Sequence, residues 1–133
     1  MMGMKTATLL LFGAAIGASG AAWSAGEVPA PKAYVVAEIN VKDLEGYRAY
    51  TTAAFPIIQQ YGGTFLTRGG KTVHVEGAAP GQRVMIIEFA SLEQAKKFEY
   101  SKEYTDIAPL RQKTSDSRLF IVEGTANAPS NKP

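Results

Sequence analysis

Cysteine is missing from this 133-residue chain, and histidine occurs once, as His74. Without a thiol there is no disulfide framework, thiolate zinc site, iron–sulfur cluster or cysteine nucleophile. One imidazole leaves little material for a transition-metal site, so we expect neither a metal nor a cofactor. A strong charge of one sign is lacking as well. The formal net charge of +2 gives too weak a basic field to indicate nucleic acid as a partner.

Charge is also missing from a long stretch near the amino terminus, between Lys5 and Glu27. This stretch has an apolar middle and then small residues, which is the pattern of a secretory signal peptide. We expect cleavage between Ala22 and Ala25 and assign residues 1–24 to the peptide, so the mature protein would be periplasmic or secreted and free of the membrane. The alternative is an uncleaved leader that anchors the chain, because the apolar stretch approaches the length of a bilayer span.

The remaining chain predicts a single folded domain at residues 33–124. Residues 25–32 contain two prolines and are interpreted as an extended linker, and residues 125–133 as a flexible tail. β-Branched and apolar runs predict strands at residues 33–41, 64–68, 83–89 and 117–123, with an extended continuation at 71–76. Apolar residues spaced by three and four predict a helix after Asp43 and helical pieces after Ser91 and Ser101.

The order strand, helix, strand, strand, helix, strand is that of the ferredoxin-like α+β fold, an antiparallel sheet with its helices on one face. The other face would be too apolar to leave in water. Its predicted members are Tyr34, Val36, Val84, Ile86, Phe120 and Val122. We therefore expect a homodimer that packs sheet against sheet.

Several local features are predicted as well. Pro56 should kink or restart the first helix. The glycine pair 69–70 should introduce a bulge or bend. Ser91 and Gln94 should form a capping box. The strand at 83–89, apolar except for Glu88, should be covered on both faces.

A set of short motifs gives the chain a family resemblance. The motifs are Gly-Tyr-Arg-Ala-Tyr at 46–50, Tyr-Gly-Gly at 61–63, Arg-Gly-Gly at 68–70, Ile-Glu-Phe at 87–89, Ser-Lys-Glu-Tyr at 101–104, and Arg111. In this order they resemble the domain of unknown function 1330 family over residues 33–124. The resemblance implies a small dimeric α+β barrel, related in fold to antibiotic-biosynthesis monooxygenases and stress-responsive barrel proteins, with no settled activity. The chain departs from the family pattern at Ala90, where proline is common, and at 98–100.

His74 and Tyr104 are the candidate catalytic residues. In an extended segment His74 and Glu76 would point the same way, so that the carboxylate could orient the imidazole as a general base. The alternative is an ordinary polar pair on an exposed edge strand.

Arg68 and Arg111 are the expected ligand contacts, because a guanidinium can hold a carboxylate or phosphate in a fixed fork. Ser101 and Tyr104 should lie near Arg111, and the family resemblance makes these three the most recurrent polar cluster. Alternatively, Ser101 is a helix cap and Tyr104 a half-buried aromatic residue.

Glu38 and Glu88 are further ligand-binding candidates, because they interrupt two strands expected to be adjacent at the centre of the sheet. A carboxylate there must be paired, protonated or at a cavity. The alternative is an ion pair with Arg68, Arg83 or Arg118 on a neighbouring strand.

These observations predict an exported dimer that binds, and in one interpretation transforms, a small organic molecule without a tightly bound cofactor. The chemistry would be proton transfer, or oxygen chemistry supplied by the substrate. The alternative is a non-catalytic binding or stress-associated interaction module, and the fold cannot choose between them. Convergence of His74 and Arg111 on one cavity would favour an enzyme, and their separation by the sheet would favour binding alone.

Overall fold

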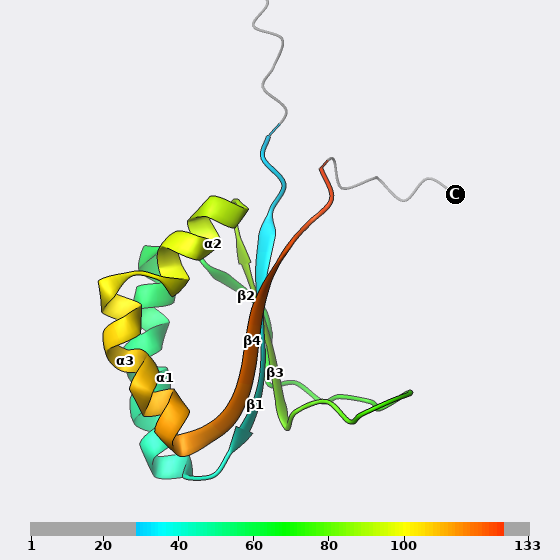
Figure 1. The fold of residues 1–133 in the computed structure, drawn as a ribbon, viewed down its shortest axis with the longest axis vertical. Coiled ribbons are helices and arrows are strands. Elements are labelled where there is room, and N and C mark those ends of the chain that lie inside the picture. Colours follow the sequence, from blue (N-terminus) through cyan, green and yellow to red (C-terminus); the bar gives the residue numbers. More distant parts are fainter. Residues whose placement is uncertain (1–28, 127–133) are drawn as a thin grey trace, which may run out of the picture.

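A computed structural model describes residues 29–126, in which a four-stranded sheet carries three helices on one face (Figure 1). The elements are β1 (Ala33–Val41), α1 (Leu44–Gln60), β2 (Thr64–Arg68), β3 (Arg83–Phe89), α2 (Leu92–Glu99), α3 (Lys102–Thr114) and β4 (Ser115–Glu123). The strand order is β2-β3-β1-β4 and every pairing is antiparallel, which confirms the predicted ferredoxin-like α+β fold. The predicted signal peptide and nearly all of the predicted tail lie outside the described residues.

The core lies between the sheet and the helices. Alternate residues of β1 and β3 point toward the helices and are buried, since side chains alternate across a strand. They are Ala33, Val35, Ala37, Ile39, Met85, Ile87 and Phe89. Tyr47, Tyr50, Ala54 and Ile58 of α1 meet them at helical spacing. In the part of the chain that the structure describes, no helix is long and apolar enough to cross a membrane.

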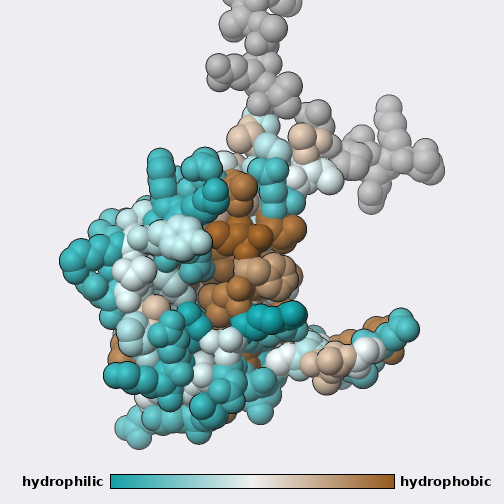
Figure 2. Space-filling model, in the orientation of Figure 1, coloured by the Kyte–Doolittle hydropathy of each residue, from teal (hydrophilic) through white to brown (hydrophobic). Residues whose placement is uncertain are grey.

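The opposite face of the sheet carries the apolar residues that the strand alternation predicts. Val36 lies between Ile86 of β3 and Phe120 of β4, and Tyr34 pairs with Val122. Phe120 and Val122 are 45% and 46% exposed, and Figure 2 shows apolar surface gathered at the side of the molecule away from the helices. The helices cover only one face of β3, and the outward residues of this strand are partly buried. Cover on the second face therefore stays a prediction.

Two predicted helix details differ in the structure. Pro56 lies inside α1, which continues to Gln60, so the helix does not restart there. The kink that was the other prediction stays a prediction. Ser91 caps α2 by accepting a hydrogen bond from the Gln94 backbone N–H at 3.1 Å. The Gln94 side chain donates instead to the Tyr61 carbonyl oxygen at 2.8 Å, so half of the predicted capping box forms. That bond ties the start of α2 to the end of α1.

The connection between β2 and β3 also differs from the prediction. Residues 69–82 form no strand: they make a loop that projects from the sheet on the side away from the helices (Figure 1). The expected extended segment at 71–76 is part of this loop and pairs with no strand of the described sheet. The irregularity expected at the glycine pair occurs earlier, between Phe65 and Thr67.

Candidate functional site

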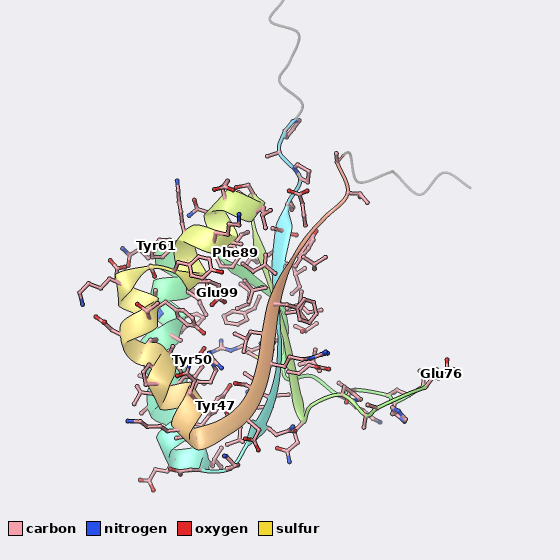
Figure 3. The ribbon with its side chains drawn as sticks, in the orientation of Figure 1. Tyr47, Tyr50, Tyr61, Glu76, Phe89 and Glu99 are labelled. Carbon is pink, nitrogen blue, oxygen red and sulfur yellow. The ribbon has the colours of Figure 1, made fainter. Side chains whose placement is uncertain are left out.

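A cavity of about 120 Å³ lies between the inner face of the sheet and the helices. Its walls are mostly apolar and aromatic. They come from β1 (Val35, Ala37, Ile39), α1 (Tyr47, Tyr50, Thr51, Ala54, Phe55, Ile58), β2 (Phe65, Arg68), β3 (Arg83, Met85, Ile87), α2 (Phe98, Glu99), α3 (Tyr104) and β4 (Leu119). Figure 3 shows Tyr47, Tyr50 and Glu99 in the layer between helices and sheet. Such a concave apolar site with few polar groups is typical of a small-molecule pocket.

A pair of buried tyrosines supplies hydroxyl groups to this cavity. Tyr50 of α1 and Tyr104 of α3 share a hydrogen bond of 2.9 Å between their hydroxyl oxygens. Burial raises the pKa of both phenols, so both stay protonated at neutral pH. Arg111 lies beside them, with its guanidinium carbon 5.8 Å from the centre of the Tyr50 ring.

Glu99, the last residue of α2, is the only acidic residue in the cavity wall. Its Oε1 atom is buried without a hydrogen-bond partner. Burial raises the pKa of this carboxyl to about 7, against the opposing effect of the Arg111 charge. The carboxyl is therefore poised to gain or lose a proton near neutral pH. The sequence analysis did not identify Glu99, although it lies in the stretch at 98–100 that departs from the family pattern.

Arg68 reaches the cavity because of the irregularity in β2. Phe65 pairs with Ile87 and Thr67 with Ile86, so the bulge at Leu66 turns Arg68 toward the helices. The guanidinium carbon of Arg68 lies 4.7 Å from the centre of the Phe55 ring and 4.8 Å from that of Phe65. Arg68, which the sequence predicts as a ligand contact, therefore lines the cavity.

Arg83, which the sequence analysis considered only as an ion-pair partner, also lines the cavity. Its guanidinium carbon is 5.7 Å from the centre of the Tyr47 ring, and its Nε atom is buried without a partner. It packs against Gly69, where a Cβ would lie 3.3 Å from the guanidinium carbon. Among residues 29–126, neither Arg68 nor Arg83 forms an ion pair with a carboxylate.

Arg111 and Ser101 lie behind the cavity wall. Arg111 is 7% exposed, donates a hydrogen bond from Nη1 to the Ser117 hydroxyl, and leaves its Nε without a partner. Ser101 accepts from the Tyr104 backbone N–H at 3.1 Å and donates to the Phe98 carbonyl at 2.7 Å. These two bonds make Ser101 the cap of α3, which is one of the two interpretations given above. Arg111 is a cation just behind Tyr50.

Glu38 and Glu88 lie on the opposite face of the sheet. Glu38 pairs with Arg118 at 2.6 Å across β1 and β4, and Glu88 with Lys32 at 2.7 Å. Both ion pairs border the apolar outer face, and neither carboxylate lines the cavity.

His74 lies on the projecting loop, away from the cavity. Its Nε2 atom is 2.7 Å from the Gly77 carbonyl oxygen, and Glu76 stands at the tip of the loop (Figure 3). The sheet separates His74 from Arg111. Within the described residues, no three metal-ligating side chains gather to form a site.

Comparisons with known proteins place this geometry in context. The model of the family described as Domain of unknown function (DUF1330) matches residues 32–125. A protein of unknown function from Rhodopseudomonas palustris is similar in structure, with a TM-score of 0.59 and 18% identity over 71% of this chain and 83% of that one. SnoaB, a cofactor-independent oxygenase from Streptomyces nogalater, is similar with a TM-score of 0.53 and 13% identity, over 77% and 100%. No curated protein matches the sequence.

Proposed function

The chain belongs to the family described as Domain of unknown function (DUF1330), and from that premise we propose that it binds a small, flat, apolar organic anion between sheet and helices. The observation that carries the proposal is the charge around the cavity. Arg68 and Arg83 line it and Arg111 lies just behind it, while Glu99 is the only acid in its wall. A carboxyl with a pKa of about 7 offsets at most one of these three positive charges.

An unpaired guanidinium in a partly dry site favours an anionic ligand. Charge-assisted hydrogen bonds are about twice as strong as neutral ones, and an arginine can grip a carboxylate with two parallel bonds. The buried Nε atom of Arg83, which has no partner, is one such unused donor. A ligand oxygen that accepts from it would relieve the cost of leaving it unpaired.

The aromatic walls define the rest of the ligand. Phe55 and Phe65 stack at 6.1 Å with their planes 9° apart, and Arg68 lies over both rings. Tyr47 and Tyr50 continue this aromatic wall along α1. Flat apolar surfaces of this kind favour an aromatic or conjugated ligand over a flexible polar one.

The fold is compatible with chemistry that needs no cofactor, because SnoaB, which shares it, is a cofactor-independent oxygenase. That activity belongs to SnoaB, and a shared fold hosts many functions. The separation of His74 from Arg111 favours binding over catalysis by the imidazole.

Export and dimerisation complete the proposal. The charge pattern of residues 1–24 supports a cleaved signal peptide and a periplasmic or secreted protein. The apolar outer face supports a homodimer, since a patch of this kind is normally covered. The loop at 69–82 projects on the same side of the sheet and would flank a second copy.

Calorimetric titration with benzoate and with benzamide tests the ligand class. The two molecules have nearly the same shape, and only benzoate is charged. We expect benzoate to bind about tenfold or more tightly, which corresponds to the strength of one charge-assisted hydrogen bond. Arg68→Ala should remove most of this preference, whereas Arg48→Ala, at an exposed position of α1, should leave it intact.

Two results would contradict the proposal. One is the absence of benzoate binding. The other is benzamide binding as tightly as benzoate, which would show that the arginines do not select charge.

A further inference from the structure

Glu99 borders two hollows at once. It lines the internal cavity, and with Tyr100 and residues 119–121 it also lines a separate depression on the surface. The depression lies at β4, the edge strand of the sheet. The carboxyl therefore stands between the cavity and the depression at the sheet edge.

Within the described residues, the Glu99 carboxyl forms no ion pair, and its Oε1 atom has no hydrogen-bond partner that would explain its position structurally. Glu99 is partly buried, and a buried oxygen in this state costs stability unless it serves a ligand or carries a proton. No backbone cap or strand pairing depends on its side chain.

The charged and titratable groups that face Glu99 come from the neighbouring helices. Tyr104 and Arg111 of α3 interact with it electrostatically, and Tyr50 of α1 is bonded to Tyr104. From β4, the residues that line the depression beside Glu99 are Leu119, Phe120 and Ile121, and none of them is titratable. Among these neighbours Arg111 is the one whose charge acts on Glu99, and the two phenols have a raised pKa. From the sheet, Arg68 and Arg83 line the same cavity. Near neutral pH the proton that moves is therefore that of Glu99.

We propose that Glu99 is the proton-exchange group of the cavity, which passes a proton between the bound organic molecule and solvent at the β4 depression. The inference rests on the proposed function, because it requires a ligand in the cavity. It also narrows the ligand to a weak organic acid, such as a phenol or an enol, and its conjugate base.

The step balances without an oxidant or a cofactor. The ligand O–H bond breaks, its electron pair stays on the ligand oxygen, and the proton bonds to a carboxylate oxygen of Glu99. The resulting anion gains stability from Arg68 and Arg83, and the reverse step restores the acid. With a pKa of about 7, Glu99 populates both forms near neutral pH, which is what an efficient acid–base group requires.

Proton uptake during benzoate binding tests this inference. Benzoate stays ionised throughout the neutral range, so it brings no proton of its own. A second negative charge in the same cavity raises the pKa of Glu99 further, because like charges disfavour each other. Calorimetry in buffers of different ionisation enthalpy should show up to one proton taken up per site, largest at about pH 7 to 8.

Three variants make the assignment specific. Glu99→Gln should still bind benzoate but abolish the proton uptake, and Glu99→Asp should retain part of it. Glu93→Gln, at an exposed position of the same helix, should behave like the unmodified protein. Circular dichroism establishes that each variant is folded.

The outcomes separate the two proposals. Benzoate binding without proton uptake, or equal uptake by Glu99→Gln, overturns the role of Glu99 and leaves the binding function standing. Failure of benzoate to bind overturns both.

Discussion

At the scale of single residues, the cavity holds two kinds of polar group. The hydroxyls of Tyr50 and Tyr104 satisfy each other, whereas Glu99 and Arg83 keep buried atoms without partners. Satisfied groups hold a site in shape, and unsatisfied ones carry a cost that a ligand can remove. We therefore expect that substituting a satisfied hydroxyl lowers folding stability, whereas substituting Glu99 changes how stability depends on pH.

Tyr50→Phe should destabilise the protein by about 1 to 3 kcal/mol, because it leaves the buried Tyr104 hydroxyl without its partner. Urea unfolding measures the change. Tyr50→Phe combined with Tyr104→Phe should cost less than the sum of the single changes, since the second substitution removes the orphaned hydroxyl. Tyr100→Phe, at a residue that is 78% exposed, serves as the control and should be nearly neutral. Full additivity of the two substitutions would show that the hydroxyls do not interact.

Glu99 should make folding stability depend on pH. Its pKa is about 7 in the folded protein, above the ordinary value of about 4.3 for a glutamate in water, so the folded state binds the proton more tightly. The contribution of protonated Glu99 to the free energy of unfolding is fully present below about pH 4.5. It is lost as pH rises through about 7, and the total loss is up to roughly 3 kcal/mol. Urea unfolding of Glu99→Gln across this range should give a flatter profile than the unmodified protein. Parallel profiles would contradict the raised pKa.

The sequence alone did not identify Glu99 and Arg83 as residues of the cavity. Glu99 and Arg83 resemble ordinary surface charges in the sequence, and their burial depends on how α2 and the sheet pack together. Tyr104 and Arg111 could be predicted as neighbours because they lie seven residues apart on one helix. His74 could not be placed, since its position depends on whether residues 71–76 find a partner strand.

At the scale of elements, the strands were the most predictable part of the fold. Alternation with a period of two is a local pattern, so the faces of β1, β3 and β4 follow from their own residues. The bulge in β2 shifts that alternation by one residue and reverses the face of Arg68, which no periodic pattern of five residues reveals. Arg68 therefore reaches the site through the irregularity in β2.

The junction between α1 and β2 is close-packed at Gly63. A Cβ there would lie 2.6 Å from Ile58 Cγ2 and 2.9 Å from Phe89 Cζ. Gly63→Ala should therefore push β2 away from the core and cost about 1 to 3 kcal/mol in thermal or urea unfolding.

Gly70→Ala is the matched control for this junction. It has open space around it and no positive φ, so it should change stability little. Equal effects of the two substitutions would contradict the packing described at the junction.

At the scale of the whole molecule, the two faces of the sheet have separate roles. One face closes the cavity with the helices, and the other presents apolar side chains between the Glu38–Arg118 and Glu88–Lys32 ion pairs. An apolar centre with a charged border has the composition of a protein interface. The proposed homodimer would therefore use the outer face of the sheet and leave the cavity on the helix-covered face accessible.

Val36→Lys should prevent formation of the proposed homodimer, because Val36 lies between Ile86 and Phe120 at the middle of the outer face. A charge buried there without a partner disfavours association. Light scattering at micromolar concentration reports the mass, and Thr52→Lys, at an exposed position of α1, should remain dimeric. A monomeric mass for the unmodified protein would contradict the proposed homodimer.

The most direct test of the account is a crystal structure of the protein soaked with 4-bromobenzoate, whose bromine gives an anomalous signal that locates the ring. We expect the bromine inside the cavity between α1 and the sheet, with the carboxylate within hydrogen-bond distance of Arg68 or Arg83. Bromine found only on the outer face of the sheet, or nowhere, while the cavity stays closed to the ligand, would contradict it.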